Sequence, residues 1–83
     1  MSEERNVDDI LSAADDSVSL INGVNAGTWE VSGMEQSEIN DMVQRNVDHL
    51  NVILAYEEVV ADSRDKSSYT GAVSVGDAYI AAN

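Results

Sequence analysis

The chain has no cysteine, no proline and no phenylalanine, and its 83 residues include one histidine and one tryptophan. Without cysteine, neither a disulfide bond nor a thiolate metal site can form. Because His49 is the sole histidine, a site that needs two imidazoles is excluded. Without phenylalanine, the core has to be built from Ile, Leu, Val, Met and Ala.

Long apolar runs are also missing. No stretch approaches the roughly 18 consecutive apolar residues of a membrane-spanning helix. The opening residues, MSEERNVDD, are acidic and lack the basic-then-apolar order of a signal peptide. We therefore expect no membrane insertion, and a location in the cytoplasm or in a particle assembled there.

Basic residues are scarce. Four Lys and Arg residues stand against sixteen Asp and Glu residues, which gives a net charge of −12. Residues 1–62 hold fourteen acids and two bases, whereas residues 63–83 hold two of each. Nucleic-acid phosphates and anionic lipids would be repelled, so we expect no direct binding to either. A basic protein partner is compatible with this charge, and so is a role in solubility alone.

The length predicts a single domain, residues 1–83. A chain this short buries little more than half of the surface that its unfolded form exposes. Association with a second copy would enlarge that small core, and we expect it.

Residues 3–21 show the clearest amphipathic helix pattern, with Gly23 suited to the position just after its end. Two acidic pairs, seven residues apart, lie opposite the apolar seam: Asp8, Asp9, Asp15 and Asp16. They form either a solvated face or an anionic strip for a basic partner. Residues 22–32 then read as a loop. Its Trp29 either packs over the helix junction or serves as an exposed binding anchor.

Residues 33–62 are predicted to form one long central helix. No proline or glycine interrupts residues 34–62, and apolar residues recur at helical spacing. Ser32 and Glu35 have the spacing of a capping box, with Ser37 as a rival cap. A second apolar stripe lies nearly opposite the main face and comprises Val52, Tyr56 and Val59. A helix that is apolar on two sides is either sandwiched within its own chain or offers a docking surface.

Two polar residues of this helix lie on or beside its main apolar face. Asn46 sits either at the edge of the seam or inside it, where it would set the helix register. His49 lies near the edge of the face with no serine nearby in sequence, and we expect it to pack or hydrogen-bond at the surface. Carboxylates at calcium-loop spacing and glycine patterns that cradle phosphate are missing. We therefore expect no catalytic residues, no metal site and no cofactor.

Residues 63–68 form a polar break, and residues 69–82 allow two interpretations. The apolar spacing favours a helix, with a smooth side of small residues at Gly71, Val75, Ala78 and Ala82. A β-hairpin turning at Gly76 and Asp77 is the alternative. The predicted fold is therefore all-α, a bundle of three helices (3–21, 33–62 and 69–82) built around the long middle one, and the alternative is α+β with a hairpin at 69–82.

Two segments, MEQSEINDMVQRNVDHL (34–50) and DSRDKSSYTGAVSVGDAYIAAN (62–83), resemble small proteins of unassigned function encoded by phages and prophages. The resemblance covers less than half of the chain and implies a context only: a virion component or a small host-interacting factor. The preferred hypothesis is a helical protein–protein interaction module that associates with itself or docks on an assembly. The alternative is an inhibitor that mimics nucleic acid and presents acidic residues to a DNA-binding protein.

Overall fold

The computed structural model describes residues 6–83, which form four α-helices. They are α1 (Val7–Ala26), α2 (Gln36–Ala55), α3 (Glu57–Ala61) and α4 (Ser67–Ala82). The described residues contain no strand, so the all-α prediction is confirmed and the hairpin alternative at 69–82 is wrong.

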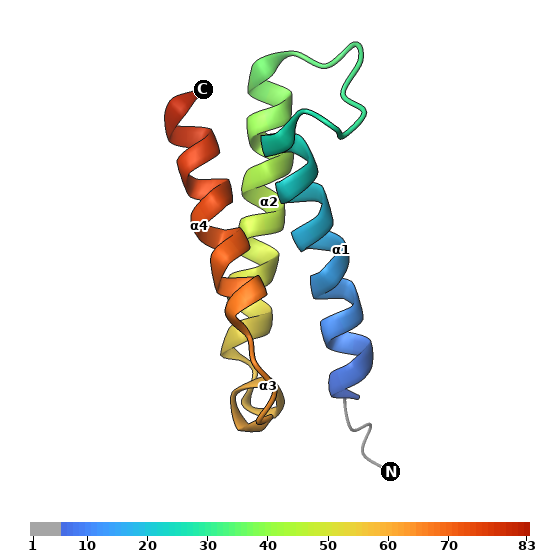
Figure 1. Ribbon diagram of the computed structural model, residues 1–83, viewed down its shortest axis with the longest axis vertical. Coiled ribbons are helices and arrows are strands. Elements are labelled where there is room, and N and C mark those ends of the chain that lie inside the picture. Colours follow the sequence, from blue (N-terminus) through green and yellow to red (C-terminus); the bar gives the residue numbers. More distant parts are fainter. Residues whose placement is uncertain (1–5) are drawn as a thin grey trace.

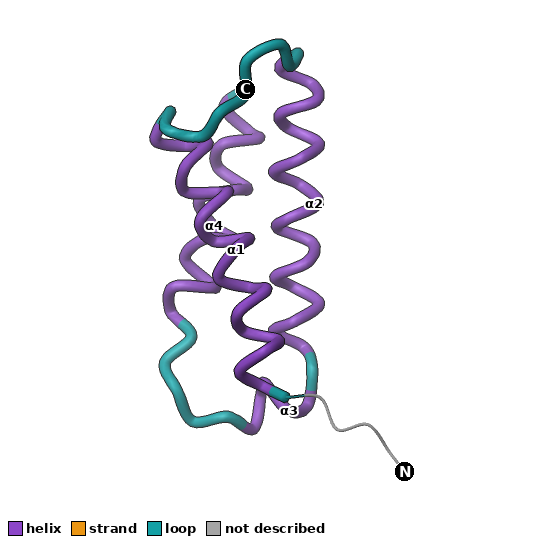
Figure 2. Tube along the Cα trace, turned by 90° about the vertical axis from the view of Figure 1, so that its right-hand side faces the viewer, coloured by secondary structure: helices purple, strands orange, loops and turns teal. Residues whose placement is uncertain are grey.

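The three long helices pack side by side into an elongated bundle of 45 × 25 × 18 Å. Helix α2 runs antiparallel to both α1 and α4 (Figure 1). The short helix α3 lies at the lower end, below α2, whereas the loop at 27–35 and the C-terminus lie at the upper end. Figure 2 shows α2 on one side of the bundle and α1 with α4 on the other. Each long helix therefore contributes one face to a common core.

The core is aliphatic, as the absence of phenylalanine predicts. A single buried cluster runs along the bundle axis, and the aromatic ring it includes is that of Tyr69. Its members are Leu11, Ala14, Ile21, Val24, Ile39, Val43, Val47, Leu50, Ile53, Val59, Tyr69 and Ala72.

Helix α4 packs tightly against α2 at Gly76. A Cβ atom at this position would overlap Val47 Cγ2 and would lie 3.4 Å from side-chain atoms of Ile21 and Val43. Gly71, on the smooth side of small residues, instead has open space around the position of a Cβ. Gly76 thus permits the close approach of the helices, whereas Gly71, Ala78 and Ala82 of the smooth side are exposed and its Val75 packs partly against the core.

Helix α1 ends later than predicted, at Ala26 instead of residue 21, and the loop shifts to 27–35. Gly27 adopts the left-handed conformation, with φ of 79°, and its N–H reaches the carbonyls of Gly23 and Val24. Gly23 lies inside the helix, and its lack of a side chain leaves room for the ring of Trp29, because a Cβ there would lie 3.0 Å from Trp29 Cε3. The predicted start at residue 3 lies outside the described residues.

The predicted central helix at 33–62 is interrupted. Helix α2 begins at Gln36, behind a capping box that joins Glu35 and Glu38, so neither Ser32 nor Ser37 is the cap. It ends at Ala55, because Tyr56 has an extended ψ of 136°. The chain then turns, and α3 buries Val59 in the core. A polar segment at 62–66 follows, and α4 begins at Ser67.

Candidate functional site

A polar cluster lies between α1 and α2 in the middle of the bundle. Ser17, only 3% exposed, donates its hydroxyl hydrogen to Asn46 Oδ1 across 2.9 Å. Its Oγ also lies 3.1 Å from Nδ1 of His49. Asn46 in turn donates Nδ2–H to the carbonyl of Met42 across 2.8 Å. The seam between the two helices thus contains one connected polar group.

The donors and acceptors of this cluster can be followed from Asn46. Its Nδ2 donates to the Met42 carbonyl, so its Oδ1 faces Ser17 and accepts the hydroxyl hydrogen. The roles in the contact between Ser17 Oγ and His49 Nδ1 depend on the tautomer of the imidazole. With the only hydroxyl hydrogen of Ser17 in the bond to Asn46, Nδ1 is the donor to Oγ. The cluster thus joins the two helices through side-chain hydrogen bonds.

This cluster supports the interpretation of Asn46 as a polar residue inside the seam. Ser17 was missed because it is separated from its two partners by 29 and 32 positions in the sequence. One signal was present, since Ser17 occupies a seam position between Ala14 and Ile21 at helical spacing. A serine in an otherwise apolar seam indicates a polar partner on the facing helix.

All four acidic residues predicted on α1 are exposed, but two of them serve contacts within the chain. Asp8 forms an ion pair with Arg64 at 2.9 Å. Asp15 lies close enough to the phenol of Tyr69 to affect its titration. Burial raises the pKa of that phenol, and the neighbouring Asp15 carboxylate raises it further. The predicted strip is therefore divided: Asp8 and Asp15 lie beside residues of other segments, whereas Asp9 and Asp16 face solvent.

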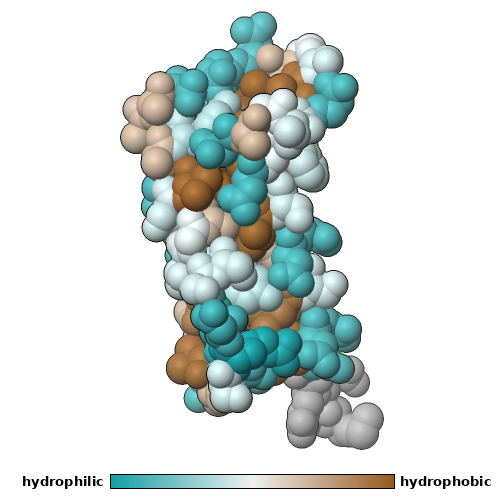
Figure 3. Space-filling model, in the orientation of Figure 1, coloured by the Kyte–Doolittle hydropathy of each residue, from teal (hydrophilic) through white to brown (hydrophobic). Residues whose placement is uncertain are grey.

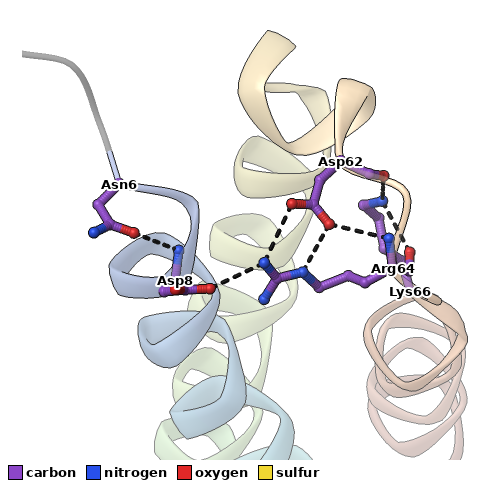
Figure 4. Close-up of polar contacts among 5 residues, drawn as sticks. All are labelled: Asn6, Asp8, Asp62, Arg64 and Lys66. Atoms are coloured by element: carbon purple, nitrogen blue, oxygen red, sulfur yellow. Dashed lines mark hydrogen bonds and ion pairs between the residues drawn. The ribbon is translucent and has the colours of Figure 1, made fainter.

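The segment at 62–66 holds the start of α1 against the start of α4. The Arg64 guanidinium lies between Asp62, 2.7 Å from its Oδ1, and Asp8 (Figure 4). Hydrogen bonds to these carboxylates, Asp62 first, raise the pKa of Arg64, and the same bond lowers the pKa of Asp62. The ammonium of Lys66 donates to the carbonyl oxygens of Asp62 and Arg64. Arg64 and Lys66, the two basic residues of 63–83, thus both make their contacts from this segment.

The predicted apolar stripe at the end of the central helix is not present as a unit. Val52 is 51% exposed and Tyr56 is half-buried, but Val59 is 0% exposed. The prediction of Val59 as a surface residue is wrong, because the break at Tyr56 turns it into the core. Val60, which was not predicted, is instead 67% exposed.

Trp29 combines the two roles considered for it. Its ring packs on Gly23 and its N–H bonds the Gly23 carbonyl, yet 39% of the residue remains exposed. Figure 3 shows apolar surface in several separate areas on one face of the molecule, with polar surface between them. On this face the apolar surface is therefore divided into small areas rather than joined in one large patch.

Residues 6–83 form no pocket and hold no group of three or more His, Asp or Glu side chains arranged to hold a metal ion. None of their helices is both long and apolar enough to cross a membrane. No protein-family model, curated protein or solved structure matches this chain.

Proposed function

We propose that this protein is a small acidic interaction module whose helices dock against a second copy of the chain within a larger assembly. The observation that carries the proposal is the pair Val52 and Val60, which are 51% and 67% exposed on either side of Tyr56. Burying a valine fully contributes about 1.5–3 kcal/mol, so two such residues at one end give association a driving force.

The outer side of α4 supports self-association. Asp77 is the sole charged residue of this helix, although the chain carries a net charge of −12. Small exposed side chains occupy the side opposite its buried face, namely those of Ser67, Gly71, Ser74, Ala78 and Ala81. Two anionic molecules repel least where their surfaces are uncharged, and small side chains let helices approach closely.

Sedimentation velocity over a range of protein concentrations tests the proposal. We expect a monomer–dimer equilibrium that shifts toward dimer as salt screens the acidic charge. The double variant Val52→Thr/Val60→Thr keeps the side-chain shape but replaces one methyl group of each valine with a hydroxyl group. Because the hydroxyl groups would lose water on docking, the variant should weaken association at least tenfold. Asn51→Ala, a neighbouring exposed position, is the matched control. A strict monomer at all concentrations and salt levels would contradict the proposal.

The resemblance of 34–50 and 62–83 to phage and prophage proteins is consistent with an assembly of this kind in a virion. The second candidate, an inhibitor that mimics nucleic acid, is favoured by one observation: α1 carries four exposed acids and no base. For that candidate, Asp16→Asn should reduce binding to a basic DNA-binding protein more than Asp8→Asn does, because Asp8 is already paired with Arg64. Equal binding by both variants would count against it.

A further inference from the structure

The junction between α2 and α3 lacks the local features that normally end a helix. Residues 34–62 contain no glycine or proline, and the φ of Tyr56, −65°, is already helical. The α2 terminus has no left-handed cap, and Tyr56 provides no side-chain cap to α3. Only the ψ of Tyr56, at 136°, separates this backbone from a continuous helix.

Contacts made by α3 explain why the chain bends there. Val59 is 0% exposed and completes the lower end of the core, while Val60 on the same helix is 67% exposed. Helix α3 has five residues, well below the roughly 12–15 at which a helix persists without tertiary contacts. Local preference for a continuous helix is thus opposed by tertiary contacts of the bent form, among them the burial of Val59 and the packing of Tyr56 against the core.

We infer that α3 is a lid with two positions, hinged at Tyr56. In the closed position, seen at the lower end of Figure 1, Val59 fills the end of the core. In the open position, the ψ of Tyr56 rotates to about −42° and residues 36–61 form one rod of about 39 Å. Val52, Tyr56 and Val59, spaced i, i+4 and i+7, then share one face of that rod. The inference rests on the proposed function and adds its regulation, because the closed lid withholds Val59 from the docking surface.

Thiol labelling tests the lid directly, since the chain contains no cysteine of its own. Val59→Cys reports opening, Val47→Cys in the core reports global unfolding, and Val60→Cys gives the labelling rate of an exposed thiol. Labelling is done at low protein concentration, where the chain is monomeric. We expect Val59→Cys to react at least tenfold faster than Val47→Cys.

Glu57 offers a way to lock the closed position. It is the first residue of α3 and follows a residue in extended conformation, a position that suits proline. In a continuous helix, proline at 57 would lie in the interior and would lose the bond to the Ile53 carbonyl. We expect Glu57→Pro to slow labelling of Val59→Cys at least tenfold. The control Glu57→Ala removes the same carboxylate, permits both positions and should leave labelling fast.

Two substitutions at Tyr56 distinguish a straightened lid from one that merely unfolds. Tyr56→Ala and Tyr56→Gly remove the same ring, but alanine favours a helix by about 1 kcal/mol over glycine, which corresponds to about fivefold in labelling rate. If the open state is helical at position 56, Val59→Cys labels about fivefold faster when combined with Tyr56→Ala than with Tyr56→Gly. If α3 only unfolds, the glycine variant labels as fast or faster, and the inference fails.

Labelling of Val59→Cys no faster than Val47→Cys, or labelling that Glu57→Pro leaves unchanged, would also overturn the lid. Should Val59→Cys not fold, relaxation dispersion of the Val59 methyl groups, in a chain that keeps this valine, replaces labelling. The same Glu57 and Tyr56 variants are then compared, with the same expectations. These readouts concern the monomer. A strict monomer whose Val59 still opens would refute the proposed self-association and leave the lid in place.

Discussion

Gly76 is the residue on which the contact between α2 and α4 depends. Gly76→Ala would force a methyl group into Val47, with a steric strain of about 1–3 kcal/mol. The gain in helix propensity, about 1 kcal/mol, offsets part or all of this strain. Gly71→Ala places the same methyl group in open space. We expect the first to lower the free energy of unfolding by up to about 2 kcal/mol and the second to raise it by about 0.5–1 kcal/mol, measured by urea denaturation. Equal effects would mean that α4 packs in another register.

Tyr69 should make the fold sensitive to alkali. Burial and the neighbouring Asp15 carboxylate raise the pKa of its phenol in the folded chain. The stability contributed by the neutral phenol is therefore fully present below the ordinary pKa of about 10 and is lost as pH rises through the higher folded pKa. We expect Tyr69→Phe to unfold at lower urea than the parent at neutral pH but to lose less stability above about pH 10. Parallel losses in both chains would show that another group controls the alkaline transition.

The residues that join the helices are the part of the molecule that sequence reasoning recovers least. Ser17 and Gly76 both lie on faces correctly predicted to be apolar, yet their roles depend on which atoms of the facing helix they meet. Asn46 was identified because a polar residue on an apolar face needs an explanation. Its partner was not, because helix periodicity contains no information about the register between two helices.

At the scale of the helices, their existence was predicted more accurately than their ends. Gly23 and Gly27 are both plausible terminators of α1, four residues apart; Gly27 takes the left-handed conformation, whereas Gly23 stays in the helix with Trp29 packed on it. The break at Tyr56 could not be predicted from its neighbours, because the burial of Val59 produces it. The predicted stripe at Val52, Tyr56 and Val59 failed for the same reason.

The end of α1 leads to a prediction that separates the two glycines. Gly27 has a φ of 79°, so Gly27→Ala forces an L side chain into the left-handed region and should cost about 1 kcal/mol. Gly23→Ala instead brings a methyl group against the ring of Trp29 and should shift the tryptophan fluorescence. Urea denaturation followed by fluorescence measures both effects. An unchanged free energy of unfolding for Gly27→Ala would mean that α1 ends elsewhere.

At the scale of the whole molecule, the all-α class follows from helical periodicity in each segment. The packing arrangement of the helices could not be predicted from the sequence, because it depends on which helix faces are buried against each other. The acidic residues show this most clearly: Asp8 and Asp15 belong to one predicted strip with Asp9 and Asp16, yet contacts with Arg64 and Tyr69 engage only the first two. A carboxylate that contacts another part of the chain, such as Asp8, is therefore expected to affect stability differently from an exposed one without such a contact, such as Asp16.

The net charge of −12 should make the folded chain more stable as salt is added, because compact states suffer most from self-repulsion. Asp16 is exposed beside Asp15 on a helix without bases, so Asp16→Asn should raise the Tm by roughly 1–3 °C at low salt. That gain should vanish at high salt, where the repulsion is screened in both chains. Asp8→Asn is the matched control: it also removes one negative charge but breaks the ion pair with Arg64, so it should give a smaller gain or a loss. If both variants raise the Tm equally, the Asp8–Arg64 pair contributes nothing in solution, and the start of α1 is not tied to the segment at 62–66.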